Sequence, residues 1–172
     1  MRFHDLRSRN AGFTLVEMIV TIVVGAVVFA LGSTILSSGF QAYFVGREIT
    51  NDDWQARLAL ERMTRELRGV RTPTAADLTI GVAGQITFTD FSGVSIIYRQ
   101  TGTILERSQG VGAFQPLADN IKASTLAFTY LQNDGATPAG TAAAVYYIAA
   151  EFTVKSTNVT VPYRGTVKPT SF

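Results

Sequence analysis

An acidic side chain, Glu17, directly precedes 29 residues, 18–46, that carry no charged side chain. An ionised group at the centre of a membrane-spanning helix costs about 3 kcal/mol, and one near the helix end costs less. An acid in such a segment is by default a functional residue whose charge needs a partner. The sequence therefore makes Glu17 the candidate functional group, and its partner the main question.

The composition limits the chemistry of the chain. Among its 172 residues there is no Cys, and the only His is His4. Disulfides, thiol nucleophiles and Cys-ligated metals are excluded, and removal of the first twelve residues would also remove the His that general bases and zinc sites commonly use. We expect no enzyme activity, no metal and no cofactor. A membrane-anchored enzyme built from carboxylates, Lys, Tyr or Ser is a less favoured alternative.

The excess of positive charge is confined to the N-terminus. Of 15 basic and 13 acidic residues, Arg2, Arg7, Arg9 and Asp5 lie in the first twelve, and they account for the formal net charge of +2. The rest of the chain is neutral, so bulk charge gives no argument for nucleic-acid binding.

Three readings compete for the N-terminal segment. A secretory signal has a shorter apolar core than this one. Residues 13–36 would form about 36 Å of helix, enough to cross a hydrocarbon core of about 30 Å as a plain, uncleaved anchor. Arginines before the helix place the N-terminus in the cytoplasm and the rest of the chain outside it. The third reading adds cleavage at the cytoplasmic end of this helix.

The residues around Gly12 carry a family resemblance. A short basic leader (1–12) that ends in Gly12, followed by Phe13-Thr14-Leu15-Val16-Glu17 and an apolar helix, resembles the class III signal of type IV prepilins and pseudopilins. The resemblance implies that a prepilin peptidase cuts between Gly12 and Phe13 and methylates the new amine of Phe13. It also implies residence in the bacterial inner membrane, followed by assembly with other pilin or pseudopilin subunits through the N-terminal helix.

Cleavage after Gly12 would create an α-ammonium close to Glu17. An opposite charge in a medium of low dielectric constant offsets the desolvation of the acid. We expect Glu17 to pair with the Phe13 amine of a neighbouring subunit. In the alternative, Glu17 extends to the lipid headgroups of a simple anchor.

Four glycines, Gly25, Gly32, Gly39 and Gly46, recur every seven residues. Successive heptad positions drift by only about 20°, so the glycines form a slowly winding stripe on one helix face. Small residues allow helices to approach closely in apolar surroundings, which predicts a helix-packing stripe. The alternative is the ordinary frequency of glycine in membrane helices.

The helical pattern continues as an amphipathic extension, residues 37–71, which Pro73 should end. Trp54 and Leu58 lie outside its apolar arc and are candidates for contact with adjacent subunits, or else isolated surface hydrophobes. Glu61 with Arg65, and Arg62 with Glu66, should form weak pairs on the exposed faces. The apolar arc should pack on the β-rich C-terminal region, residues 72–172, which we call the head. It comprises Val45, Ile49, Ala56, Leu60, Met63, Leu67 and Val70.

Residues 55–67 also resemble the corresponding segment of J-type minor pseudopilins of type II secretion and of PilW-type minor pilins. Major subunits of the family often carry a calcium site or a C-terminal disulfide loop. This sequence shows neither pattern, which favours a minor subunit at or near the tip of a type IV pilus or a type II secretion pseudopilus.

Residues 72–172 alternate in the β manner, as in Ile86 and Phe88 or Ile96 and Tyr98. The segment 146–154 and then Val159, Val161 and Tyr163 should add further half-buried strands, and 136–144 should be a mobile loop. The fold class is therefore α+β, with a long N-terminal helix packed against one antiparallel sheet.

A second function remains open, that of a tip adhesin or DNA-binding minor pilin. It would need exposed aromatic and basic side chains together. Tyr98, Arg99, Tyr163 and Arg164 are the candidates.

Overall fold

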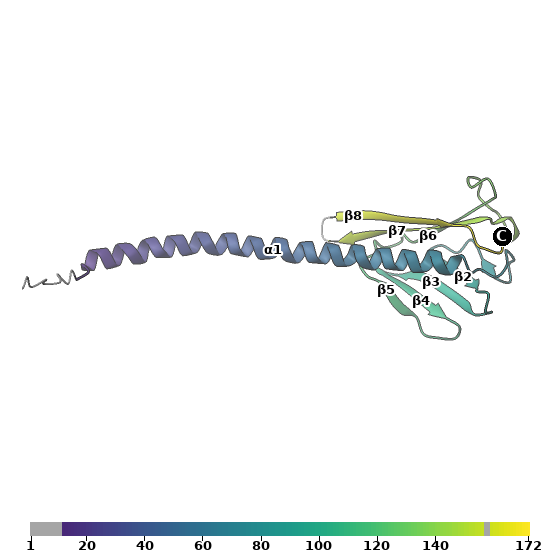
Figure 1. The fold of residues 1–172 in the computed structure, drawn as a ribbon, viewed down its shortest axis with the longest axis horizontal. Helices are drawn as coiled ribbons and strands as arrows, with labels where there is room; N and C mark the ends of the chain where they lie inside the picture. The colour runs from purple at the N-terminus through teal and green to yellow at the C-terminus, as the bar shows by residue number, and fades with distance from the viewer. Residues whose placement is uncertain (1–11, 157–158) are drawn as a thin grey trace, which may run out of the picture. The chain divides into compact units, whose positions relative to one another are not determined.

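The computed structural model describes residues 12–156 and 159–172, so the expected leader lies, apart from Gly12, outside the described residues. The chain divides into two compact units, Met1–Phe44 and Val45–Phe172, and one helix, α1 (Leu15–Leu67), begins in the first unit and ends in the second (Figure 1).

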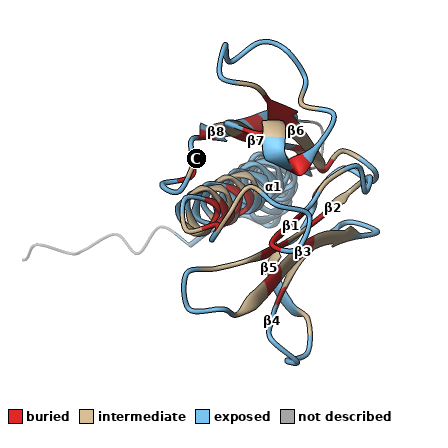
Figure 2. Ribbon diagram, turned by 90° about the vertical axis from the view of Figure 1, so that its right-hand side faces the viewer, coloured by how far each residue is buried: buried red, intermediate tan, exposed pale blue. Residues whose placement is uncertain are grey.

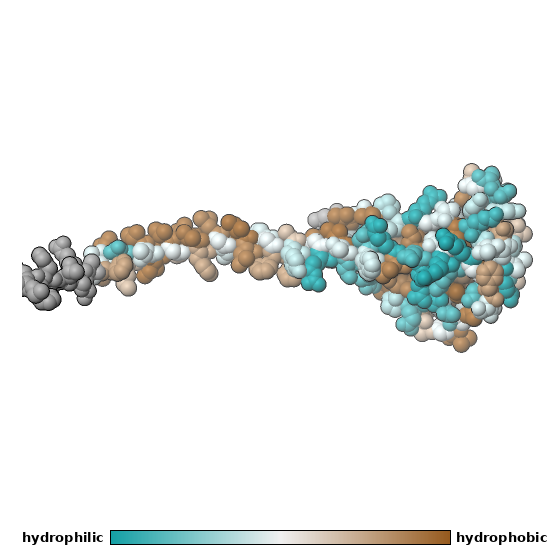
Figure 3. Space-filling view, in the orientation of Figure 1, coloured by the Kyte–Doolittle hydropathy of each residue, from teal (hydrophilic) through white to brown (hydrophobic). Residues whose placement is uncertain are grey.

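The described part of the first unit is helical from Leu15 onward. No Pro interrupts it, and Thr14 caps its start. Its side chains are exposed in the single chain and largely apolar, as the brown surface of this segment in Figure 3 shows. By length and composition the helix can cross a membrane.

In the second unit α1 ends at Leu67, four residues before the predicted end at Arg71. The amides of Gly69 and Val70 bond to carbonyls only three residues back, which tightens and closes the last turn. Val70 then forms an isolated β-bridge with Asp90. Pairing with the sheet therefore ends the helix before Pro73 does.

The strands that follow form two antiparallel sheets, where the sequence predicted one. The first has the order β1-β2-β3-β4-β5, and its hairpin turns use Gly93 and Gly102 at φ 76° and 62°, a region that glycine adopts without strain. Its strands are β1 (Leu78–Thr79), β2 (Gln85–Thr89), β3 (Ser95–Thr101), β4 (Ile104–Gln109) and β5 (Gln115–Ala118).

The second sheet has the order β6-β7-β8, with β6 (Ala127–Leu131), β7 (Tyr147–Ser156) and β8 (Val159–Val167). The segment between the sheets contains Asn120 and Ser124 at φ 55° and 59°, and it leads the chain from one sheet to the other. The predicted loop 136–144 contains a short 3₁₀ helix, Ala142–Ala144, and its Ala142 is buried.

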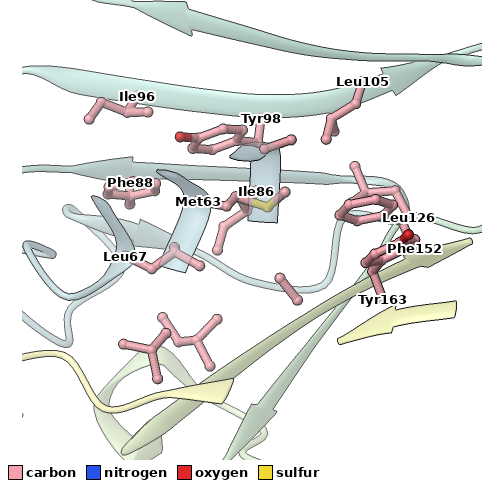
Figure 4. Packing of buried hydrophobic residues seen from close by; sticks show 14 of the residues in the cluster. Met63, Leu67, Ile86, Phe88, Ile96, Tyr98, Leu105, Leu126, Phe152 and Tyr163 are labelled. Carbon is pink, nitrogen blue, oxygen red and sulfur yellow. The ribbon is translucent and has the colours of Figure 1, made fainter. Parts of the chain in front are cut away.

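Within the second unit, α1 lies between the two sheets, and the buried residues of both sheets face it (Figure 2). Met63 and Leu67 of the helix meet Ile86 and Phe88 of β2 in the core (Figure 4). Two stacked aromatic pairs add to it, Phe88 with Tyr98 (centroids 6.4 Å apart) and Phe152 with Tyr163 (5.7 Å).

Most of the predicted apolar arc is in the core, since Ala56, Met63, Leu67 and Val70 are buried. Val45 is exposed, because the core begins farther along the helix.

Val159 and Val161, predicted to share the buried face of Tyr163, are exposed instead, at 40% and 37%. They pair with Ser156 and Val154 of β7, beyond the part of β7 (147–151) that pairs with β6. There the inter-sheet segment replaces β6 beside β7, through an isolated bridge between Ile121 and Val154.

Candidate functional site

The candidate site begins where the helix begins. The Glu17 amide donates a hydrogen bond to Oγ1 of Thr14 (3.3 Å), and the Met18 amide donates to the Thr14 carbonyl (3.2 Å). Thr14 is thus the N-cap, and Thr14-Leu15-Val16-Glu17 has the spacing of a capping box. Glu17 lies in the first helical turn, where the helix dipole favours a negative side chain.

The bond between Gly12 and Phe13 lies outside the helix, because residues 12–14 have no regular secondary structure. Gly12 is exposed, and Phe13 is 79% exposed. A peptidase needs an accessible, non-helical segment, and these residues provide one directly before a capped helix. The sequence motif and an accessible, non-helical peptide bond therefore occur at the same position, between Gly12 and Phe13.

Among the residues that the structure describes, none outside the helix lies close to the glycine stripe. A Cβ built on Gly25, Gly32, Gly39 or Gly46 has no other atom within 4 Å, apart from the backbone of its own helix turn. The other side chains of the uncharged segment 18–46, which we call the stem, are exposed as well. In the described residues this surface is therefore open to lipid or to another chain.

On the second unit, Trp54 and Leu58 are 61% and 47% exposed. Both large apolar groups therefore remain accessible on the helix.

Acidic side chains of the helix form hydrogen bonds with both sheets and with the segment between them, and the sequence did not indicate these partners outside the helix. Asp52 is only 4% exposed and accepts from Nδ2 of Asn120 (3.1 Å to each oxygen). The next residue, Asp53, accepts from the hydroxyl of Tyr163 on β8 and from Nε of Arg57 (2.8 Å). Adjacent acids thus hold the inter-sheet segment and the second sheet.

Glu66 fastens the helix to the first sheet. It accepts from the Tyr98 hydroxyl (2.7 Å), from Nε of Arg107 (2.8 Å) and from Nε of Arg62 (3.1 Å). Burial raises the pKa of Glu66, but the hydrogen bonds from Arg107, Tyr98 and Arg62 outweigh it and hold the pKa below its usual value. Burial and the neighbouring Glu66 carboxylate raise the pKa of Tyr98.

The sequence predicted only the Arg62 partner of Glu66. Its contacts with Tyr98 and Arg107 join residues 32 and 41 positions apart, and no local pattern indicates such pairs.

The four candidates for nucleic-acid binding do not form one exposed surface. Tyr98 is fully buried, and Tyr163 is 8% exposed. Arg99 pairs with Glu106 (2.8 Å) and stacks on the ring of Phe114. The two tyrosines are therefore core residues, and they are not available to stack on bases.

Within the described residues, no group of three or more His, Cys, Asp or Glu side chains is placed to hold a metal ion.

Comparison with known protein families finds a match at the N-terminus. Residues 7–33 match the family described as the prokaryotic N-terminal methylation motif, a range that includes Gly12, Phe13 and Glu17. No curated protein matches the chain.

The motif and the long apolar helix that begins within it support a prepilin-like protein whose helix is long and apolar enough to cross a membrane. The chain is a type IV prepilin-like protein, and its motif implies processing by a prepilin peptidase.

Proposed function

We propose that the chain is a minor pilin or pseudopilin subunit that a prepilin peptidase cleaves between Gly12 and Phe13 and methylates on Phe13. It then assembles at or near the tip of a type IV pilus or a type II secretion pseudopilus. The observation that carries the proposal is the N-terminal methylation motif at residues 7–33, which contains an exposed bond, Gly12–Phe13, directly before a capped helix.

In the proposed precursor, residues 13–36 hold the subunit in the bacterial inner membrane. The leader arginines keep the N-terminus in the cytoplasm, and the head lies outside it. Cleavage removes the positive leader and leaves a new α-ammonium group on Phe13.

In the proposed filament, Glu17 pairs with the Phe13 amine of a neighbouring subunit. Two unit charges 4 Å apart attract by about 4 kcal/mol at an effective dielectric constant of 20. This attraction offsets the cost of removing both groups from water only when the two subunits are adjacent. The pair therefore favours the assembled state over the isolated subunit.

The exposed surface of the stem would supply the rest of the contact. The glycine stripe lets helices approach closely, and the apolar side chains around it pack against their neighbours. Trp54 and Leu58 would extend this contact to the base of the head. The resemblance of residues 55–67 to minor subunits supports the choice of a minor subunit over a major one.

The proposal is tested by Glu17→Ala, measured as incorporation into sheared filaments of cells that express the complete assembly machinery. We expect the variant to insert into the membrane and to be cleaved, but to be depleted from filaments. The matched control is Glu48→Ala, which removes an exposed acid of the same helix outside the uncharged segment. Incorporation of Glu17→Ala at the control level would refute the ion pair.

A further inference from the structure

Three aromatic side chains gather on one face of α1 near the end of the first unit. Phe40, Tyr43 and Phe44 are all more than half exposed. At 100° per residue they lie within an arc of about 100°, together with Leu36. Tyr43 and Phe44 pack edge to face, with ring centroids 5.8 Å apart and planes at 65°. We refer to Phe40, Tyr43 and Phe44 as the aromatic cluster.

The aromatic cluster borders an apolar groove. Ile35, Leu36, Gly39, Phe40 and Tyr43 line this groove, whose volume is about 420 Å³. A Cβ on Gly39 would meet no other atom within 4 Å, so the missing side chain leaves the groove open. Ile35 and Leu36 also belong to the segment 13–36 that can span the membrane. The groove is therefore continuous with the surface that faces lipid.

The length of the uncharged segment places the aromatic cluster relative to the membrane. Glu17 marks one boundary of the hydrocarbon core, because the segment after it carries no charge until Arg47. At 1.5 Å per residue, Phe40 lies about 34 Å along the helix from Glu17, and Phe44 about 40 Å. The hydrocarbon core is about 30 Å thick, and headgroups bring the total to about 40–45 Å. Because headgroups add only about 5–8 Å on each side of the core, the cluster begins in the head-side headgroup layer at Phe40 and reaches the outer edge of that layer at Phe44.

The chemistry of the rings suits this layer. Tyr carries an apolar ring with a polar hydroxyl, and aromatic side chains are enriched where hydrocarbon meets water. A helix tilt of about 20° shortens its projection on the bilayer normal by only about 6%, which leaves the cluster beyond the core.

We propose that the aromatic cluster is a membrane-interface anchor that lies among the phospholipid headgroups on the head side of the span. A phospholipid occupies the groove over Gly39, with its headgroup against Tyr43, its glycerol region against Phe40 and its upper acyl chain against Ile35 and Leu36. This anchor sets the depth of the membrane-resident subunit. This proposal depends only on the membrane span and not on filament assembly, so the proposal can fail while the proposed function holds.

The test uses the full chain in phosphatidylcholine and phosphatidylglycerol vesicles, with tryptophan fluorescence as a depth gauge. The only native tryptophan is Trp54, so Trp54→Phe gives a background without this fluorophore. In that background, Tyr43→Trp places the probe in the cluster and Val27→Trp places it near the centre of the span. Nitroxide quenchers are attached either to the headgroup or near the end of the acyl chain, in both leaflets.

We expect the headgroup quencher to quench the Tyr43→Trp variant severalfold more than the acyl quencher does. The Val27→Trp control should show the reverse order. Trp54 of the unaltered chain should be quenched little by either, because it lies about 55 Å along the helix from Glu17.

Two results would overturn the proposal. Stronger quenching of Tyr43→Trp by the acyl quencher would place the cluster inside the core. Absence of quenching by both, with Val27→Trp quenched as expected, would place the cluster outside lipid altogether.

Discussion

The side-chain amide of Asn120 donates to both carboxylate oxygens of Asp52 at 3.1 Å, and this contact joins the helix to the segment between the two sheets. Asp52 is only 4% exposed, so water would have little access to its carboxylate if the hydrogen bonds from Asn120 were lost. Asn120 also adopts φ 55°, which Asn tolerates better than most residues. One residue thus provides both the turn and the donor.

Asn120→Ala should lower the free energy of unfolding by about 1–3 kcal/mol, because it leaves a buried acceptor unsatisfied and strains the turn. Asn120→Gly removes the donor but not the left-handed conformation, so it should cost less. Near-UV circular dichroism of the purified full chain in detergent, followed through a urea titration, measures both values. Equal stability of Asn120→Ala and the unaltered chain would contradict this role.

The contacts of Glu66 predict sensitivity to acid. Its pKa is lower in the folded state than in the unfolded state, where it is near 4.5. A lowered pKa contributes stability above the unfolded value, and this contribution is lost as the pH falls through the folded value. Glu66→Gln should therefore destabilise the protein by about 1.5–3 kcal/mol at neutral pH, and less in acid.

The measurement for Glu66 is urea unfolding of both proteins at about pH 7 and about pH 3. The gap in stability between Glu66→Gln and the unaltered chain should narrow at the lower pH. A gap that is independent of pH would mean that the ionised carboxylate is not what Tyr98 and Arg107 stabilise.

A close approach between β8 and α1 predicts a steric effect at Gly165. A Cβ there would lie 2.7 Å from Cγ2 of Thr64 and 3.2 Å from Cδ1 of Leu60. Thr64 is held in place, because its hydroxyl donates to helix carbonyls. Gly165→Ala should cost about 1–3 kcal/mol of stability.

Combining Gly165→Ala with Thr64→Ser, which removes Cγ2, should recover much of this loss. Gly140→Ala is the control, since a Cβ there meets nothing within 4 Å. Urea unfolding of Gly165→Ala, Thr64→Ser, the double variant and Gly140→Ala measures these effects. The steric explanation fails if Thr64→Ser gives no recovery.

The exposed side chains of Trp54 and Leu58 on the helix predict an effect on assembly without an effect on folding. Trp54→Ala combined with Leu58→Ala removes accessible apolar area, so stability should change by less than about 0.5 kcal/mol. Incorporation into filaments should fall. Phe91→Ala, an equally exposed aromatic of the β2–β3 turn, is the control and should assemble normally. Normal incorporation of the double variant would make Trp54 and Leu58 isolated surface hydrophobes.

The sequence was most informative where the signal is local. Glu17, the uncharged segment and the leader all lie within one short stretch, and the family match falls on that same stretch. Strands β2 and β3 were also predictable, because Ile86, Phe88, Ile96 and Tyr98 alternate cleanly with more exposed residues.

Other features have no local signal. Polar residues 106–109 and Pro116 obscure the alternation of β4 and β5, so both strands were missed. The division into two sheets depends on a connection that turns at Asn120 and Ser124. The anchoring contacts of Asp52 and Asp53 join residues 68 and 110 positions apart, and only the folded chain brings them together.

The central claim is that processing uncovers Phe13 as a positively charged terminus for Glu17 to neutralise. Mass spectrometry of the purified protein, from cells with and without the prepilin peptidase, tests it most directly. We predict that peptidase-containing cells yield a chain that begins at Phe13 with one added methyl group, whereas cells without the peptidase yield the uncleaved leader. A leader that remains attached in the presence of the peptidase would contradict the account.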